Sequence, residues 1–419
     1  MLIMFSWWGM VDNFTQRLTL PSSNLAIPRV WLYLLVAVFS VSTNAQTVNF
    51  LYLEQKLPPR AVLSNLFAEP SDSGLRGAEL AIADSNTTGR FLNQQYQMSS
   101  VVDVDAKVLL EKALDAIASN PNTLILANMP SPALKALLHD PRIFQQTIVF
   151  NIADKANALR TSDCATGLLH TLPDRAMLAD ALVQFLIRKG WKKWLLISQE
   201  NSNDQEYVAS LQRSAKRFGG KIIDQRSWTF QTDLRRTAQA ELPLFTQARD
   251  YDVVLVADEV GDVGEYVLYN TWLPRPVAGT QGLQAVAWHR VIEQWGAVQL
   301  QNRFQALTGR DMNSTDYAAW LAVRSVAEAA TRTGSETPNQ LYAYMLSDDF
   351  ELAAFKGRKL NYRGWNGQLR QPIPLIHPRS LVSQSPQEGF LHPLTDLDTL
   401  GFEAPEVNCQ FNTTLKNNS

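Results

Sequence analysis

The chain has 419 residues, of which 46% are hydrophobic and 19% are charged, and its formal net charge is -2. This composition is that of a globular protein and excludes a disordered chain. The near-neutral charge, with only short basic stretches at 188–193 and 356–359, argues against a nucleic-acid partner. The length exceeds what one hydrophobic core normally organises, so we expect two domains.

Residues 30–41 form a short apolar run near the N-terminus, preceded by Arg29 and followed by small residues up to Ala45. A run of about a dozen residues is too short to cross a bilayer comfortably. It has the length of the apolar region of a secretory signal. We therefore predict that residues 1–45 are a signal peptide cleaved near Ala45, and that the mature protein is periplasmic. An uncleaved N-terminal anchor is the alternative.

From residue 46 the first half of the chain alternates apolar, β-rich runs with runs of helical period. Strands are predicted at 47–53, 96–104, 123–127 and 147–152. Helices are predicted around 75–82 and at 108–118 and 132–138. Strands separated by helices indicate a parallel sheet with helical crossovers.

The second half repeats this rhythm after residues 157–172, which show no clean period and are predicted to cross between domains. Helices are predicted at 175–189, 205–218, 234–248, 294–307, 316–331 and 339–346. Strands are predicted at 191–198, 221–228, 252–257, 360–370 and 372–376. Proline and glycine at 274–279 suggest a second crossover.

The order of elements predicts an α/β protein with two doubly wound parallel-sheet lobes joined by several hinge crossovers. We expect residues 46–155 and approximately 285–340 to form the first lobe. Residues 156–284 and approximately 341–378 are expected to form the second lobe, and residues 379–419 a C-terminal tail.

The two cysteines, Cys164 and Cys409, are an even pair in a chain that we expect to be exported. An oxidising compartment favours a disulfide between them, which would tie the tail to the middle of the chain. Two separately buried thiols are the alternative, since the sequence does not give the Cα distance on which the bond depends.

Most catalytic signatures are absent from the sequence. It contains no phosphate-binding GxxxxGK[ST], no GxSxG nucleophile turn and no GxGxxG after the first strand. The histidines are scattered, and no pair of metal-ligating residues has the spacing of a zinc site. We therefore expect no metal and no cofactor, and a protein that is not an enzyme. A secreted enzyme is retained as a third possibility.

Polar residues follow several predicted strands at their carboxyl ends, where ligands bind in open parallel sheets. We predict that the ligand-binding residues are Glu54, Ser131, Asn151 and Asp154 in the first lobe and Gln199, Asn201, Asp258 and Glu259 in the second. Ser131 begins a helix whose amides suit an anion, and the acidic members suit a cation. Two facing sets on hinged lobes would clamp a ligand. Taken singly, each residue is also explained as a solvated loop or helix cap.

Several stretches resemble the type I periplasmic solute-binding proteins, the fold of the branched-chain amino-acid receptors of ABC importers. The resemblance covers essentially the whole mature chain. It is carried by GLRGAELAIADSNTTGRF (74–91), HTLPDRAMLADAL (170–182), RPVAGTQGL (275–283), QWGAVQLQNRF (294–304), DYAAWLAVRSVAEAA (316–330) and WNGQLRQPI (365–373). More narrowly, these stretches are similar to binding proteins associated with pyrroloquinoline-quinone-dependent alcohol dehydrogenase systems.

The resemblance implies an exported, monomeric receptor that captures a small molecule between its lobes and offers it to an inner-membrane ABC permease. Residues 53–74 form a loop after the first strand that is longer than, and different from, that of amino-acid-binding members. Leucine is therefore not carried over as the ligand. A ligand-sensing or envelope-scaffolding module with the same fold and no transport role is the alternative.

Overall fold

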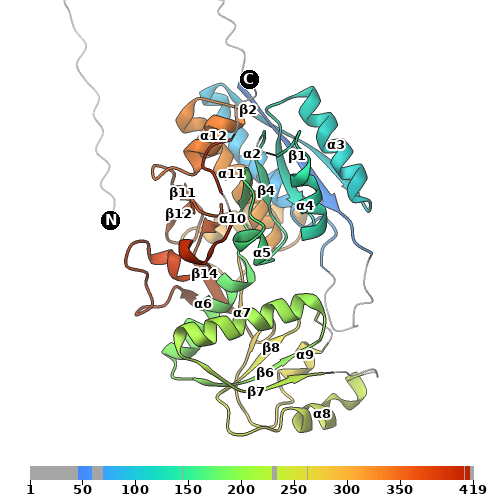
Figure 1. Cartoon of the computed structure of the whole chain (residues 1–419), viewed down its shortest axis with the longest axis vertical. Coiled ribbons are helices and arrows are strands. Elements are labelled where there is room, and N and C mark those ends of the chain that lie inside the picture. The colour runs from blue at the N-terminus through green and yellow to red at the C-terminus, as the bar shows by residue number, and fades with distance from the viewer. Residues whose placement is uncertain are drawn as a thin grey trace, which may run out of the picture. The chain divides into compact units, whose positions relative to one another are not determined.

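The computed structural model describes residues 46–58, 69–144, 146–228, 234–261, 263–409 and 411–415, with the side chains of 234–236 left out. The predicted signal peptide, residues 1–45, lies outside the described residues. Residues from Ala45 onward form one compact unit. Figure 1 shows its strands in two separate groups, with β1 and β4 in one and β6, β7 and β8 in the other.

The first sheet has five parallel strands in the order β2-β1-β3-β4-β5. Their bounds are β1 (Gln46–Gln55), β2 (Gln94–Asp103), β3 (Leu124–Asn128), β4 (Val149–Asn151) and β5 (Leu168–His170). Strand β5 lies inside residues 157–172, which were predicted to cross between domains. That prediction was wrong for β5 because a buried strand of three residues is too short to show a period.

Helices cover both faces of the first sheet, as the alternation within β1 requires. Phe50 and Tyr52 pack in one hydrophobic cluster, whereas Leu51 and Leu53 pack in another on the opposite face. The first face is covered by α2 (Leu75–Leu92), α10 (Ala297–Thr308), α11 (Ser314–Thr333) and α12 (Pro338–Met345). The opposite face is covered by α3 (Ala106–Ser119), α4 (Ser131–His139) and α5 (Ala158–Thr161).

Helices α2 and α11 approach each other closely at Gly77. A Cβ atom at Gly77 would lie 1.9 Å from the backbone oxygen of Asp316, so only glycine permits this contact. Tyr317 and Val323 of α11 are fully buried in the same cluster as Phe50. The C-terminal half of the chain therefore completes the core of the first sheet.

The second sheet has the order β15-β14-β10-β9-β8-β6-β7 and is parallel from β7 to β10 and antiparallel at β14 and β15. Its strands are β6 (Lys193–Ser198), β7 (Lys221–Ser227), β8 (Val253–Ala257), β9 (Val277–Gly279), β10 (Leu283–Ala285), β14 (Ile373–His377) and β15 (Ser380–Ser385). The accompanying helices are α6 (Arg175–Arg188), α7 (Ser202–Phe218), α8 (Leu234–Phe245) and α9 (Gly264–Val267).

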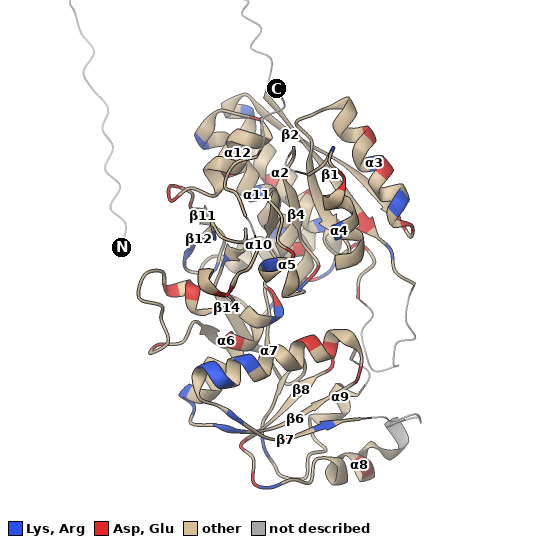
Figure 2. Cartoon of the chain, viewed as in Figure 1, with Lys and Arg blue, Asp and Glu red and all other residues tan. Residues whose placement is uncertain are grey.

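Helix α7 carries opposite charges at its two ends. Asp204 lies in its first turn, and Lys216 and Arg217 lie in its last turn. Figure 2 shows red residues at one end of this helix and blue residues at the other. This arrangement complements the helix dipole, and Asn201 caps the first turn by accepting a hydrogen bond from the Asp204 backbone N–H at 3.0 Å.

The residues that follow α11 pack on a different sheet from the one that the predicted lobes assigned to them. Residues 341–370 were assigned to the second lobe, but Tyr342 and Tyr362 are buried in the cluster of the first sheet. This region includes β11 (Leu352–Ala353), β12 (Lys359–Tyr362) and β13 (Leu369–Arg370). Strand β15 lies in the predicted tail. Residues after α11 pack on the helix they follow, and the chain joins the second sheet only at β14.

The segments that pass between the two sheets are hydrogen-bonded to each other. The Gln371 side chain donates to the carbonyl of Thr171 at 2.8 Å, which links the crossing after β13 to the crossing after β5. The buried Arg160 guanidinium donates to the Gln368 side chain at 3.1 Å and to the Leu172 carbonyl at 3.1 Å. The crossings are therefore held as one unit.

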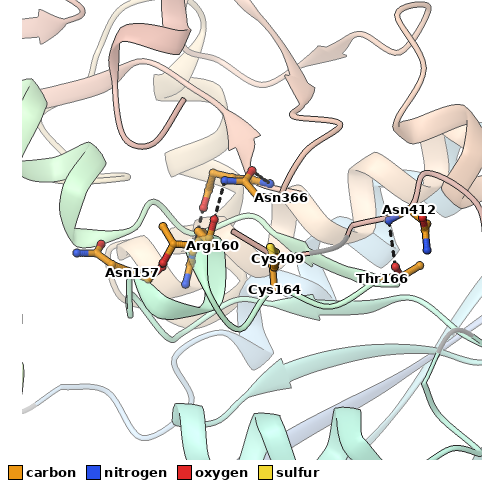
Figure 3. Close-up of a disulfide and its surroundings, with 9 residues drawn as sticks. Asn157, Arg160, Cys164, Thr166, Asn366, Cys409 and Asn412 are labelled. Carbon is orange, nitrogen blue, oxygen red and sulfur yellow. Dashed lines mark hydrogen bonds between the residues drawn. A yellow bond between two sulfur atoms is a disulfide. The ribbon is translucent and has the colours of Figure 1, made fainter. Parts of the chain in front are cut away.

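The C-terminal residues form a further link, which contains the disulfide between Cys164 and Cys409 (Figure 3). The two Cα atoms are 5.8 Å apart. Next to the disulfide, the Asn412 backbone N–H donates to Thr166 Oγ1 at 3.1 Å. At the other end of this segment, the Gly401 backbone N–H donates to Asp180 on α6 at 2.8 Å. The tail thus connects α6 of the second sheet to the loop before β5 of the first.

Candidate ligand-binding cleft

A cleft of about 850 Å³ lies where the carboxyl ends of strands from both sheets meet. Residues at or after the ends of β1, β3 and β4 line one wall, including Glu54, Asn128 and Lys155. Residues after β8 and β9 line the other wall, including Glu259 and Gln281. Because parallel strands end at the same edge of a sheet, residues far apart in the sequence converge here.

Glu54 stands at the end of β1 and belongs to a polar network of the first wall. Tyr52 Oη lies 3.1 Å from Glu54 Oε2 and 3.0 Å from the carbonyl of Ser73. The amide of Asn128 donates to Tyr52 Oη at 2.8 Å. Burial raises the pKa of Glu54, and the nearby acids Asp72 and Glu69 raise it further against the opposing effects of Tyr52 and Lys56. Within the described residues, Glu54 forms no ion pair.

Asp258 on the second wall is hydrogen-bonded to the loop that follows it. Its carboxylate accepts hydrogen bonds from the backbone N–H groups of Gly261 at 2.9 Å, Val263 at 2.9 Å and Gly264 at 2.6 Å. These contacts fix the start of α9. Asp258 therefore shapes the wall of the cleft by organising its backbone.

Glu259, next to Asp258, is paired with Arg175 at the start of α6. Arg175 Nε donates to Glu259 Oε1 at 2.9 Å and Nη2 to Oε2 at 2.7 Å. Burial alone would raise the pKa of Glu259, but Lys155 and Arg175 hold it below its ordinary value. The charge of Glu259 is thus compensated within the protein, partly by Lys155 from the opposite wall.

Tyr207 is an aromatic residue with a polar group that lines the cleft. It lies on α7, only 3% of its surface is exposed, and its hydroxyl has no hydrogen-bond partner among the described residues. Burial raises the pKa of Tyr207, and the negative charge of Glu259 adds to this. Because Tyr207 lines the cleft, its hydroxyl can take a hydrogen-bond partner from a ligand or from solvent.

Ser131 and Asp154, two of the predicted ligand-binding residues, bind each other. Asp154 Oδ2 accepts from the Ser131 backbone N–H at 2.5 Å and from Ser131 Oγ at 2.7 Å. Asp154 Oδ1 accepts from the Ala156 backbone N–H at 2.7 Å. Asn151 closes the same turn, because its side chain accepts from the Asp154 backbone N–H at 2.9 Å and donates to the Asp154 carbonyl at 2.8 Å.

Gln199 and Asn201 hold the turn between β6 and α7. The carbonyl of Gln199 accepts from the Gln205 side chain at 2.5 Å, and Asn201 caps the helix. Of the eight predicted residues, the structure brings Glu54, Asp258 and Glu259 together in the cleft lining. The other five, Ser131, Asn151, Asp154, Gln199 and Asn201, form caps and turns beside it.

Sequence reasoning missed much of the second wall. Thr280 and Gln281 line the cleft directly after β9. Their segment was predicted as a crossover because of Pro274 and Pro276, so no strand end was expected there. Tyr207 was missed because it lies within a helix, where its burial is explained equally well by the core. A polar aromatic residue two turns after a strand end is a weak signal that could have drawn attention to it.

Comparison with known proteins identifies the fold of the chain. A family model described as a periplasmic binding protein matches residues 61–264, just under half of the chain. No curated protein matches the sequence significantly. A branched-chain amino-acid ABC transporter periplasmic ligand-binding protein from Burkholderia xenovorans superposes with a TM-score of 0.64 at 16% identity, covering 86% of this chain and 98% of that protein. The chain has the type I periplasmic binding protein fold.

Two further solved structures show what this fold accommodates. A leucine-, isoleucine-, valine-, threonine- and alanine-binding protein from Brucella ovis, in a closed conformation, has a TM-score of 0.64 at 13% identity, covering 88% of this chain and 100% of that one. A solute-binding protein from R. palustris in complex with benzoate has a TM-score of 0.55 at 13% identity. The match covers 80% of this chain and 93% of that one. At these identities the likeness concerns the fold, and the predicted fold class is confirmed.

The described residues place further limits on the site. They contain no helix long and apolar enough to cross a membrane. They also contain no group of three or more His, Cys, Asp or Glu side chains arranged to hold a metal ion. The aromatic residues Trp288 and Tyr317 stack on each other with ring centroids 4.3 Å apart in the core of the first sheet.

Proposed function

We propose that this protein is an exported solute-binding receptor that captures a small molecule in the cleft and delivers it to an inner-membrane ABC permease. One observation carries the proposal. The cleft of about 850 Å³ is lined by strand ends of two sheets and by Tyr207, whose hydroxyl has no hydrogen-bond partner among the described residues. Its volume lies in the range of small-molecule sites, roughly 300–1,000 Å³.

Capture follows from the way the walls are attached. Each wall belongs to a different sheet, and a few hydrogen-bonded crossing segments join the sheets, so small rotations there change the width of the cleft. Closure on a ligand excludes water and strengthens the remaining electrostatic contacts. Lys155 and Glu259 carry opposite charges on opposite walls and favour the closed form.

Transport is supported by the similar solved structures, which are ligand-binding and solute-binding proteins of ABC transporters. Delivery to a permease requires the periplasmic location that the predicted signal peptide would provide. These similar proteins bind solutes, and in line with them we propose no enzymatic activity. A finer proposal, supported only by the sequence resemblance, is that the solute belongs to pyrroloquinoline-quinone-dependent alcohol oxidation.

A thermal-shift screen of the purified mature protein tests the proposal. The panel contains branched-chain amino acids, short carboxylates, alcohols, polyols, amines and pyrroloquinoline quinone. We expect a saturable rise in melting temperature for one class, because a ligand that binds the native state stabilises it by mass action. A folded protein that no member stabilises, and that yields no solute from periplasmic extract, would contradict capture and favour a scaffolding module.

A further inference from the structure

The protein's own carboxylates occupy the helix N-termini beside the cleft. Such N-termini normally attract anions, because their first backbone N–H groups are unpaired and the helix dipole is positive there. At α4, Asp154 binds both the backbone N–H and the hydroxyl of Ser131. Ala153 and Lys155, on either side of Asp154, line the cleft, so this occupied position lies at its edge.

Internal carboxylates also accept hydrogen bonds from backbone N–H groups of other segments around the cleft. At α9, Asp258 binds the backbone N–H groups of Val263 and Gly264. Asp316 Oδ1, from α11, accepts from the Gly74 backbone N–H at the start of α2 at 2.8 Å. After β8, the Glu259 backbone N–H donates to Asp204 at 2.7 Å. A carboxylate ligand would have to displace one of these groups in order to bind the same backbone N–H groups.

The charged groups that remain in the cleft also disfavour an anion. Lys155 and Lys56 line it, but Lys155 compensates Glu259 and Lys56 faces Glu54. Glu54 has no ion-pair partner among the described residues and can only accept hydrogen bonds when ionised. Tyr207 adds a hydroxyl that donates or accepts. The cleft therefore favours a solute with O–H or N–H donors.

We propose that Asp154 determines the class of solute. At the edge of the cleft it occupies the Ser131 N–H and hydroxyl, which would otherwise be open to a ligand carboxylate. The cleft then receives a solute that has no carboxylate and that donates hydroxyl or amine hydrogens to Glu54. This inference rests on the proposed receptor function and specifies its ligand. Polyols and amines share the required donor chemistry, and the experiment separates them.

Titration calorimetry with leucine and with benzoate tests the role of Asp154. For the wild-type protein we expect the dissociation constant of each compound to lie above about 1 mM. In Asp154→Ala the Ser131 N–H and hydroxyl are free, and we expect at least about tenfold tighter binding of one of the two carboxylates. Asp154→Ser is a second variant with a smaller change in polarity, in case the alanine variant does not fold.

Asp105→Ala is the matched control. Asp105 caps α3 by accepting from the Lys107 backbone N–H at 2.8 Å, but, unlike Asp154, it has no neighbours in the sequence that line the cleft. This variant should gain no carboxylate binding. Submillimolar binding of either carboxylate to the wild type would overturn the proposal while leaving the receptor function intact. Folded Asp154 variants that gain no affinity would overturn it as well.

Titration of the wild type with xylitol and with ethanolamine separates the two donor classes. Binding of either compound supports the donor class and identifies it as polyol or amine. If the protein binds only carboxylates, the inference fails although the receptor function stands. If it binds no solute of any class, the receptor function itself fails, and the Asp154 variants still report whether that residue occludes a carboxylate site.

Discussion

The acidic residues on the two walls of the cleft differ in whether the protein compensates their charge. On the second wall, Asp258 is bound by three backbone N–H groups and Glu259 by Arg175. On the first wall, Glu54 is half-buried and has no ion-pair partner among the described residues. We infer that Asp258 and Glu259, whose charges are compensated within the protein, shape their wall, whereas the carboxylate of Glu54 is available to bind a ligand. The comparison predicts that changes on the second wall cost stability, and that changes at Glu54 cost binding.

Removing Arg175 should give the largest effect. Its guanidinium binds Glu259 and also Glu206 at 2.8 Å, and only 6% of its side chain is exposed. Arg175→Ala leaves Glu259 buried without its partner, which should lower the free energy of unfolding by about 3–5 kcal/mol. Urea unfolding measures this. Arg142→Ala removes an exposed pair with Asp140 and should cost less than about 1 kcal/mol. Equal losses in the two variants would refute the distinction.

The pH dependence of stability should reveal Asp204, which lies behind the second wall. Burial, with the charges of Asp258 and Glu259, raises the pKa of Asp204 to about 6. The folded protein then holds this proton more tightly than the unfolded chain does. The resulting stability is present below about pH 4 and is lost as the pH rises through 6.

Asp204→Asn should remove this dependence. At pH 7 the variant should gain up to about 3 kcal/mol relative to the wild type, at about 1.4 kcal/mol per unit of pKa difference. Unfolding curves of both proteins from pH 4 to pH 8 measure the difference. If the two proteins lose stability in parallel over this range, Asp204 does not carry the raised pKa.

Glu54→Gln tests the first wall. The change keeps the size of the side chain and removes its charge, so ligand affinity should fall by about 1.5–3 kcal/mol, the contribution of a hydrogen bond to a charged group. Stability should change by less than about 1 kcal/mol. Calorimetry with the ligand found in the screen, together with urea unfolding, gives both values. A loss of stability without a loss of affinity would assign Glu54 a structural role.

Tyr207→Phe should have the smallest effect on affinity. It removes only the hydroxyl, which has no protein partner, so the apo protein should be unchanged or slightly more stable. Ligand affinity should fall by about 1 kcal/mol, as for one neutral hydrogen bond. Tyr251→Phe is a control with a buried tyrosine outside the cleft lining. Unchanged affinity in Tyr207→Phe would show that the hydroxyl faces solvent in the bound state.

The comparison also explains how much of the site the sequence could predict. The alternation of apolar strands and helices and the strand-end rule were enough to place Glu54, Asp258 and Glu259 at the strand ends that line the cleft. The contact between Ser131 and Asp154 depends on the packing of β3 beside β4, which no local pattern reports. The same holds for residues 341–370, whose apolar residues are compatible with either sheet until their partner α11 is known.

Mass spectrometry of the solute released from natively purified protein tests the central claim most directly. We predict one compound in about equimolar amount that carries hydroxyl or amine groups and no carboxylate, and that is depleted in Glu54→Gln. A carboxylate-bearing compound, or equal release from both proteins, would contradict the account.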